Sequence, residues 1–81
     1  MTQEETIVRL RTVMKRSSRI QADWDAVRPD TKIETLGFDS LSILDLIYDI
    51  QQEFKLDFEA EEVVAIKTVG QLADFLVKKG A

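Results

Sequence analysis

Residues 39–55 read DSLSILDLIYDIQQEFK, and this stretch decides the fold. Its large apolar side chains recur every three or four residues, which is the period of one face of an α-helix. That face consists of Ile43, Leu46, Ile47, Ile50 and Phe54. The pattern predicts an amphipathic helix over about residues 40–55.

A second apolar stripe runs along the same predicted helix. It contains Leu41, Leu44 and Tyr48, again at helical spacing. Asp45 and Asp49 interrupt this stripe. Because charged side chains are seldom buried without a partner, we expect the second stripe to lie partly outside the core.

Two further helices are marked by capping boxes, in which a Thr is followed three residues later by Glu or Gln. Thr2 and Glu5 precede an apolar period that predicts a helix near residues 3–16. Thr68 and Gln71 open a last helix. The apolar face of that last helix consists of Val69, Leu72, Ala73 and Leu76.

The segment between the first two helices, residues 17–39, lacks a sustained period and contains Pro29 and Gly37. A structureless loop of this length is unusual in a compact domain, so we expect a short turn and several anchoring side chains. The expected anchors are Trp24, Val27, Ile33 and Leu36. Residues 57–66 predict one or two short helical turns.

The fold class that follows is all-α. Residues 1–81 are expected to form a single domain, a small four-helix bundle with three longer helices, one short helix and a long first loop. No strand pattern competes with this interpretation.

The amino-acid composition argues against several classes of function. With no cysteine and no histidine, the chain lacks disulfides, thiolate metal ligands and the commonest general base, so neither a metal site nor conventional enzyme chemistry is expected. The sequence contains no apolar run of membrane-spanning length and no signal-peptide pattern. These features predict a cytoplasmic or organelle-matrix protein that does not insert into membranes.

The charge is unevenly distributed. The net charge is −4, yet residues 39–62 carry eight acidic side chains against Lys55 alone. Such a segment would repel the phosphates of nucleic acid and would suit a basic protein surface. An ordinary solvated helix face is the alternative explanation.

Ser40 stands where the central helix is expected to begin. Either Asp39 or Ser40 can act as the N-cap, which accounts for a serine at this position without any further role. If Asp39 caps the helix, the Ser40 hydroxyl is left to point outward. A helix N-terminus favours an anion, so a phosphodiester on Ser40 would be well placed.

The run LGFDSLSILDLIYDIQQEF, residues 36–54, followed by IKTVGQLADFL, residues 66–76, resembles the acyl carrier proteins. The resemblance implies that Ser40 is esterified by 4′-phosphopantetheine, transferred from coenzyme A. It also implies that Asp39 and Leu41 contact the phosphopantetheinyl transferase. In that family the thiol that holds acyl thioesters belongs to the prosthetic arm, which agrees with a chain that has no cysteine and needs no catalytic base.

The same resemblance implies that the central helix is a recognition surface for basic patches on synthases, reductases, ligases and acyltransferases. The implied interface consists of Leu41, Leu44, Asp45, Tyr48, Asp49, Glu53 and Ile66. A monomer is expected. The inner stripe, with Ile47, Ile50 and Leu72, is expected to part for an aliphatic cargo.

The sequence departs from the common pattern of carriers in fatty acid synthesis. Thr35, Ser42, Gln51 and Gln52 stand where acidic residues are frequent in the family, so the recognition helix is less acidic. The pathway therefore stays open between fatty acid, polyketide-like and specialised lipid synthesis, and an aminoacyl cargo such as D-alanine is an alternative. An unmodified helical interaction module is a further alternative. A serine hydrolase using Ser40 would lack a histidine base.

Overall fold

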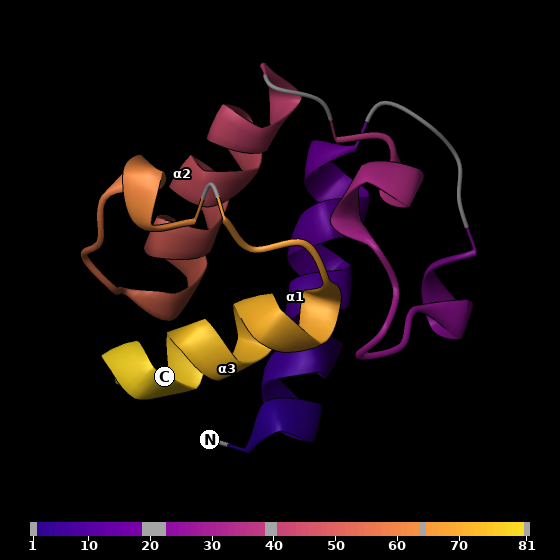
Figure 1. The fold of residues 1–81 in the computed structure, drawn as a ribbon, viewed down its shortest axis with the longest axis horizontal. Helices are drawn as coiled ribbons and strands as arrows, with labels where there is room; N and C mark the ends of the chain where they lie inside the picture. Colours follow the sequence, from indigo (N-terminus) through magenta and orange to yellow (C-terminus); the bar gives the residue numbers. More distant parts are fainter. Residues whose placement is uncertain (1, 19–22, 39–40, 64, 81) are drawn as a thin grey trace.

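The computed structural model describes residues 2–18, 23–38, 41–63 and 65–80. The helices in chain order are α1 (Gln3–Ser17), the 3-10 turns η1 (Trp24–Ala26) and η2 (Ile33–Leu36), α2 (Ser42–Phe54), the 3-10 turn η3 (Ala60–Glu62), and α3 (Val69–Lys79). Helix α1 runs through the middle of the molecule, with α2 on one side and η1 and η2 on the other, and α3 crosses it (Figure 1).

The all-α architecture confirms the predicted fold class. The short fourth helix falls within the predicted segment as η3, a 3-10 turn of three residues. Within the described ranges the nearest approach to a sheet is one isolated antiparallel bridge between Lys32 and Thr68.

Helix α2 begins at Ser42, two residues later than predicted, and Leu41 occupies its N-cap position. Asp39 and Ser40, which the sequence predicted as alternative caps, lie outside the described residues.

The core is formed where the apolar faces of the three α-helices meet. The faces predicted for α2 and α3 are confirmed, and the half-buried Ile43 packs against the edge of this core. The largest side chains with less than 2% exposure are Leu10, Met14, Leu46, Ile50, Leu72 and Leu76. Thr6 is also buried, and its hydroxyl keeps a hydrogen-bond partner there because it donates to the backbone oxygen of Thr2 at 2.7 Å.

The long first loop is held by the side chains that the sequence indicated. Val27, Ile33 and Leu36 are buried, and Trp24 packs against the core while half-buried. The guanidinium of Arg11 on α1 adds a polar anchor, because its Nη2 donates to the backbone oxygen of Val27 at 2.6 Å.

The same loop completes the N-terminus of α3. The first N–H groups of a helix have no partner within it, and here the loop supplies acceptors. The N–H of Val69 donates to the carbonyl of Thr31 at 2.9 Å, and the N–H of Gly70 donates to that of Pro29 at 2.8 Å. The Thr68 hydroxyl accepts from the N–H of Gln71, as the capping box predicted. The loop is therefore fixed to α3 shortly before the chain reaches residues 39 and 40.

No helix in the described ranges is both long enough and apolar enough to cross a membrane. The described acidic side chains also form no group of three or more placed to hold a metal ion.

Candidate functional site

The candidate site begins at the N-terminal end of α2. Ser40 and Asp39 themselves lie outside the described residues, so the site is defined by the side chains that follow them. Leu41 is 76% exposed and supplies no side-chain hydrogen bond to the first turn of α2. Helix α2 contains 13 residues, which is long enough to present a positive dipole end beside position 40.

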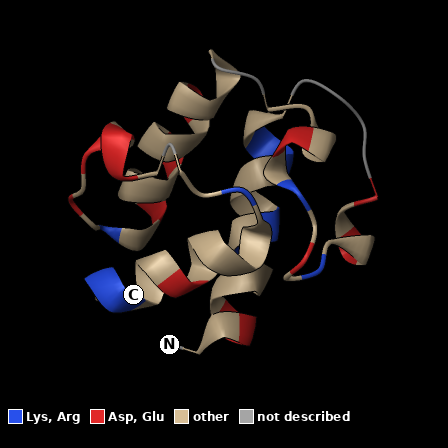
Figure 2. Ribbon diagram, in the orientation of Figure 1, with Lys and Arg blue, Asp and Glu red and all other residues tan. Residues whose placement is uncertain are grey.

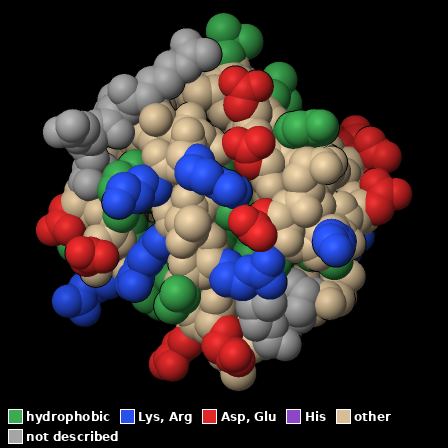
Figure 3. Space-filling model, turned by 180° about the vertical axis from the view of Figure 1, so that it is seen from behind, with side chains coloured by type: hydrophobic (Ala, Val, Ile, Leu, Met, Phe, Trp, Pro, Cys, Tyr) green, Lys and Arg blue, Asp and Glu red, His purple; other side chains and the backbone are tan. Residues whose placement is uncertain are grey.

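An exposed apolar stripe continues from this end along α2. Leu44 is 51% exposed and Tyr48 is 62% exposed, whereas the opposite stripe of the helix is buried. Asp45 lies in the exposed stripe and is itself exposed. Seen from behind, hydrophobic side chains gather at the end of the molecule where α2 begins (Figure 3). The expectation that this stripe lies partly outside the core is confirmed.

The other two predicted acids of α2 have partners within the molecule. The Ser17 hydroxyl on α1 donates to Oδ2 of Asp49. Glu53 is bound by two arginines of α1: its Oε2 lies 3.1 Å from Arg9 Nη2, and its Oε1 lies 3.1 Å from Arg16 Nη2. Two of the three carboxylates on this helix therefore already take part in contacts with α1.

Arg9 is held in place by more than the charge of Glu53. Its Nη2 also donates to the backbone oxygen of Glu53 at 2.9 Å. Its guanidinium lies over the ring of Phe54, 4.7 Å from the centroid, in a geometry that is favourable for a cation–π interaction. The arginine is thus fixed across the end of α2. The sequence prediction did not include this cluster.

Ile66, the last residue predicted for the interface, is half-buried and packs against the core. Its backbone N–H donates to the carbonyl of Val63 at 3.0 Å. Its role in an interface stays a prediction.

A second acidic region lies around η3, at the edge of the molecule (Figure 2). The carboxylate of Glu62 accepts from Lys79 Nζ at 2.8 Å and from the backbone N–H of Glu59 at 2.8 Å. These two hydrogen bonds, the one from Lys79 being the stronger effect, lower the pKa of Glu62 from its ordinary value.

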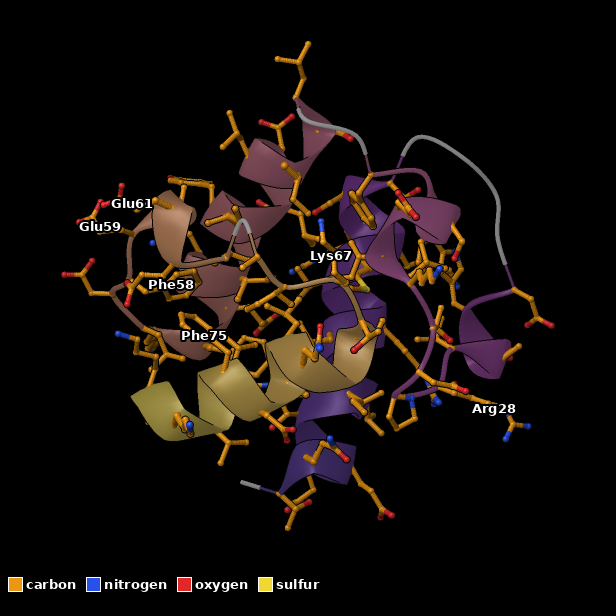
Figure 4. The ribbon with its side chains drawn as sticks, in the orientation of Figure 1. Arg28, Phe58, Glu59, Glu61, Lys67 and Phe75 are labelled. Carbon is orange, nitrogen blue, oxygen red and sulfur yellow. The ribbon has the colours of Figure 1, made fainter. Side chains whose placement is uncertain are left out.

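Beneath this acidic region two aromatic rings hold the segment to α3. Phe58 and Phe75 meet edge to face, with ring centroids 5.2 Å apart, while Glu59 and Glu61 point away from the bundle (Figure 4). The acids around η3 thus lie on a packed turn, away from the start of α2 (Figures 1 and 2).

A phosphorylated group on residue 40 fits this setting in two respects. The nearby N-terminus of α2 favours an anion, and the first described neighbour, Leu41, is largely exposed. The described residues that follow position 40 thus present an exposed apolar stripe, Leu41, Leu44 and Tyr48.

Comparison with known proteins agrees with this geometry. Residues 9–76 match the family model described as a phosphopantetheine attachment site. The chain is 35% identical over 63 residues to an acyl carrier protein of Chlorobium phaeobacteroides, covering 76% of this chain and 81% of the relative. It is 36% identical over 63 residues to an acyl carrier protein of Bdellovibrio bacteriovorus, with the same coverage.

The fold is similar to a solved structure as well. The crystal structure of an acyl carrier protein from Thermotoga maritima matches with a TM-score of 0.78 at 28% sequence identity, covering 95% of this chain and 88% of that one.

The family model, the named relatives and the matching fold together identify a carrier domain. The chain belongs to the acyl carrier protein family, and the covalent cofactor of this family is 4′-phosphopantetheine.

Proposed function

We propose that Ser40 is the residue that carries the 4′-phosphopantetheine, and that the chain presents acyl groups on this arm to the enzymes that elongate, modify or transfer them. The observation that carries the proposal is the family match over residues 9–76, which spans position 40 and the whole of α2. The exposure of Leu41, directly after Ser40, supports it.

The thiol of the arm supplies the thioester chemistry, and the chain supplies attachment, recognition and shelter. Asp39 and Leu41 would contact the phosphopantetheinyl transferase. The exposed stripe of α2 would dock the acyl-handling enzymes, at an effective concentration raised by the tether.

Shelter for an aliphatic cargo would come from the inner stripe of α2. Ile47, Ile50 and Leu72 are between 1% and 6% exposed, so a cargo that entered between α2 and α3 would have to displace them. Apolar surface buried by the cargo would offset part of the cost of separating these side chains.

The relatives are named acyl carrier proteins, which favours an acyl cargo over an aminoacyl one. Fatty acid, polyketide-like and specialised lipid synthesis all supply such cargo, and each uses enzymes that transfer an acyl group to or from a thiol.

The attachment site can be tested by intact-protein mass spectrometry. The protein would be incubated with coenzyme A, Mg²⁺ and a broad-specificity phosphopantetheinyl transferase. We expect the wild type to gain one phosphopantetheine and Ser40→Ala to gain none. Ser42→Ala is the matched control, because it removes the neighbouring hydroxyl of the same motif, and it should be modified like the wild type. Modification of Ser40→Ala, or a wild type that never gains the group, would contradict the proposal.

A further inference from the structure

The exposed surface of α2 differs from what its sequence suggests, because the acids of the helix are not equally available. Asp45, Asp49 and Glu53 follow one another at intervals of four residues, so each lies about 40° further round the helix than the last. The first of the three acids therefore faces solvent and the last faces α1. Asp45 is exposed, Asp49 is half-buried against Ser17, and Glu53 meets Arg9 and Arg16.

The pairing neutralises the C-terminal end of α2. Glu53 is bound by one arginine at each carboxylate oxygen, and only 31% of its side chain is exposed. A partner cation approaching Glu53 would meet two arginines already in contact with it. A basic residue of another protein would therefore gain little there and would be repelled by the surplus positive charge.

The first two turns of α2 have the opposite character. Leu41, Leu44 and Tyr48 are three of the four exposed large hydrophobic residues among the described residues. Asp45 lies among them, and within the described chain it has no ion-pair partner. This part of the helix presents three apolar side chains around one available carboxylate.

We infer that the enzymes acting on the Ser40 arm recognise the first two turns of α2 through an apolar groove bordered by a single Lys or Arg opposite Asp45, and that Glu53 takes no part in docking. The inference rests on the proposed function and deepens it. Leu44 and Tyr48 supply the contact area, and the ion pair with Asp45 fixes the position of the partner along α2. The docking surface ends before Glu53, because Glu53 is already paired with Arg9 and Arg16.

Charge complementarity favours this partner over a broadly basic patch. A partner with several cations along α2 would place some of them against Arg9 and Arg16, where like charges destabilise the complex. A partner with one cation near the start of the helix avoids that conflict. Large aromatic and aliphatic side chains near the centre of an interface usually carry most of the binding energy.

The test measures the KM of a broad-specificity phosphopantetheinyl transferase for this carrier. Leu44→Ala and Tyr48→Ala each remove a central apolar contact, and we expect each to raise KM about tenfold, the equivalent of roughly 1.4 kcal/mol. Asp45→Asn removes one exposed charge pair and should raise KM about two- to fivefold. All three side chains are exposed, so the variants should fold, and circular dichroism would verify it.

The matched control is the double variant Arg16→Gln/Glu53→Gln, which removes one acid and one base and keeps the net charge. Its KM should stay within about 1.5-fold of the wild type, since an exposed ion pair outside the contact contributes little. A double variant that raises KM as much as Asp45→Asn would overturn the inference, as would unchanged KM values for Leu44→Ala and Tyr48→Ala. A wild type that is never modified would overturn the proposed function and this inference together.

Discussion

The first loop makes a close backbone contact with α3 at Gly70. Its N–H donates to the carbonyl of Pro29 at 2.8 Å. A Cβ atom at position 70 would lie 2.7 Å from that carbonyl oxygen and 2.9 Å from the Cβ of Pro29. Both distances are too short for real contacts, so Gly70→Ala must push the loop away from the helix.

The size of the effect can be estimated from three contributions. Overpacking typically costs about 1–3 kcal/mol. Weakening the hydrogen bond from Gly70 to Pro29 adds about 0.5–1.5 kcal/mol. Replacing glycine by alanine returns about 0.4–1 kcal/mol, because the unfolded chain loses freedom. We therefore expect a net loss of about 2 kcal/mol, which for a domain of this size lowers Tm by about 8–16 °C.

Thermal and urea unfolding followed by circular dichroism would measure this loss. Gly80→Ala is a useful comparison, because its Cβ would meet nothing closer than Leu56 at 3.8 Å and its cost arises only from the positive φ of 117°. Pro29→Gly removes the Cβ of Pro29, which is one of the atoms that the added Cβ of Gly70→Ala would contact. It should therefore reduce the cost of Gly70→Ala by at least about 0.5 kcal/mol and leave that of Gly80→Ala unchanged. A Gly70→Ala variant as stable as the wild type would refute the reasoning.

Three other changes have expected outcomes in the same unfolding assays. Thr68→Ala removes the hydroxyl that accepts from the Gln71 N–H at 3.2 Å and should cost about 1 kcal/mol, whereas Thr68→Ser should keep most of the cap. Lys55 has left-handed backbone angles (φ 53°), so Lys55→Gly should raise stability by about 0.5–1 kcal/mol and Lys55→Ala should not. Folding lowers the pKa of Glu62 below its ordinary 4.5, mainly through Lys79, so its stabilising contribution is complete above that pH and is lost as pH falls through the folded pKa. Glu62→Gln should therefore flatten the acid side of the stability–pH curve, and an unchanged curve would contradict this assignment.

The features that the sequence predicted well depend on local chemistry. The capping boxes at Thr2 and Thr68 place a donor and an acceptor three residues apart, so they indicate a helix start without knowledge of the rest of the fold. The buried face of α2 follows from a period of 3.6 residues in the same way. The three-residue η3 has too few residues to show a period, so its position within residues 57–66 was predicted only broadly.

The features that could not be predicted join residues far apart in the chain. Arg9 and Arg16 are seven residues apart, which shows that they share a face of α1 but not that this face meets Glu53. The left-handed backbone at Lys55 also has no signal in the sequence, since glycine or asparagine is the usual residue there. The close contact of Pro29 with Gly70 depends on how the long loop returns to α3.

Because Arg9 and Arg16 pair with Glu53, the number of acidic residues on α2 does not by itself say how a partner would bind. Attraction at long range and contact in the bound complex have to be considered separately. At long range an approaching enzyme responds to the whole charge distribution of the carrier. The carrier's net charge of −4 would speed its encounter with a basic enzyme, in a salt-dependent way. The charge of Glu53 is already compensated by Arg9 and Arg16, so in the docking that we propose the apolar stripe and Asp45 would hold the complex. Added salt should therefore slow association while leaving the dissociation rate nearly constant. Recognition through several exposed acids would instead make both rates depend on salt, because each ion pair in the bound complex would be weakened.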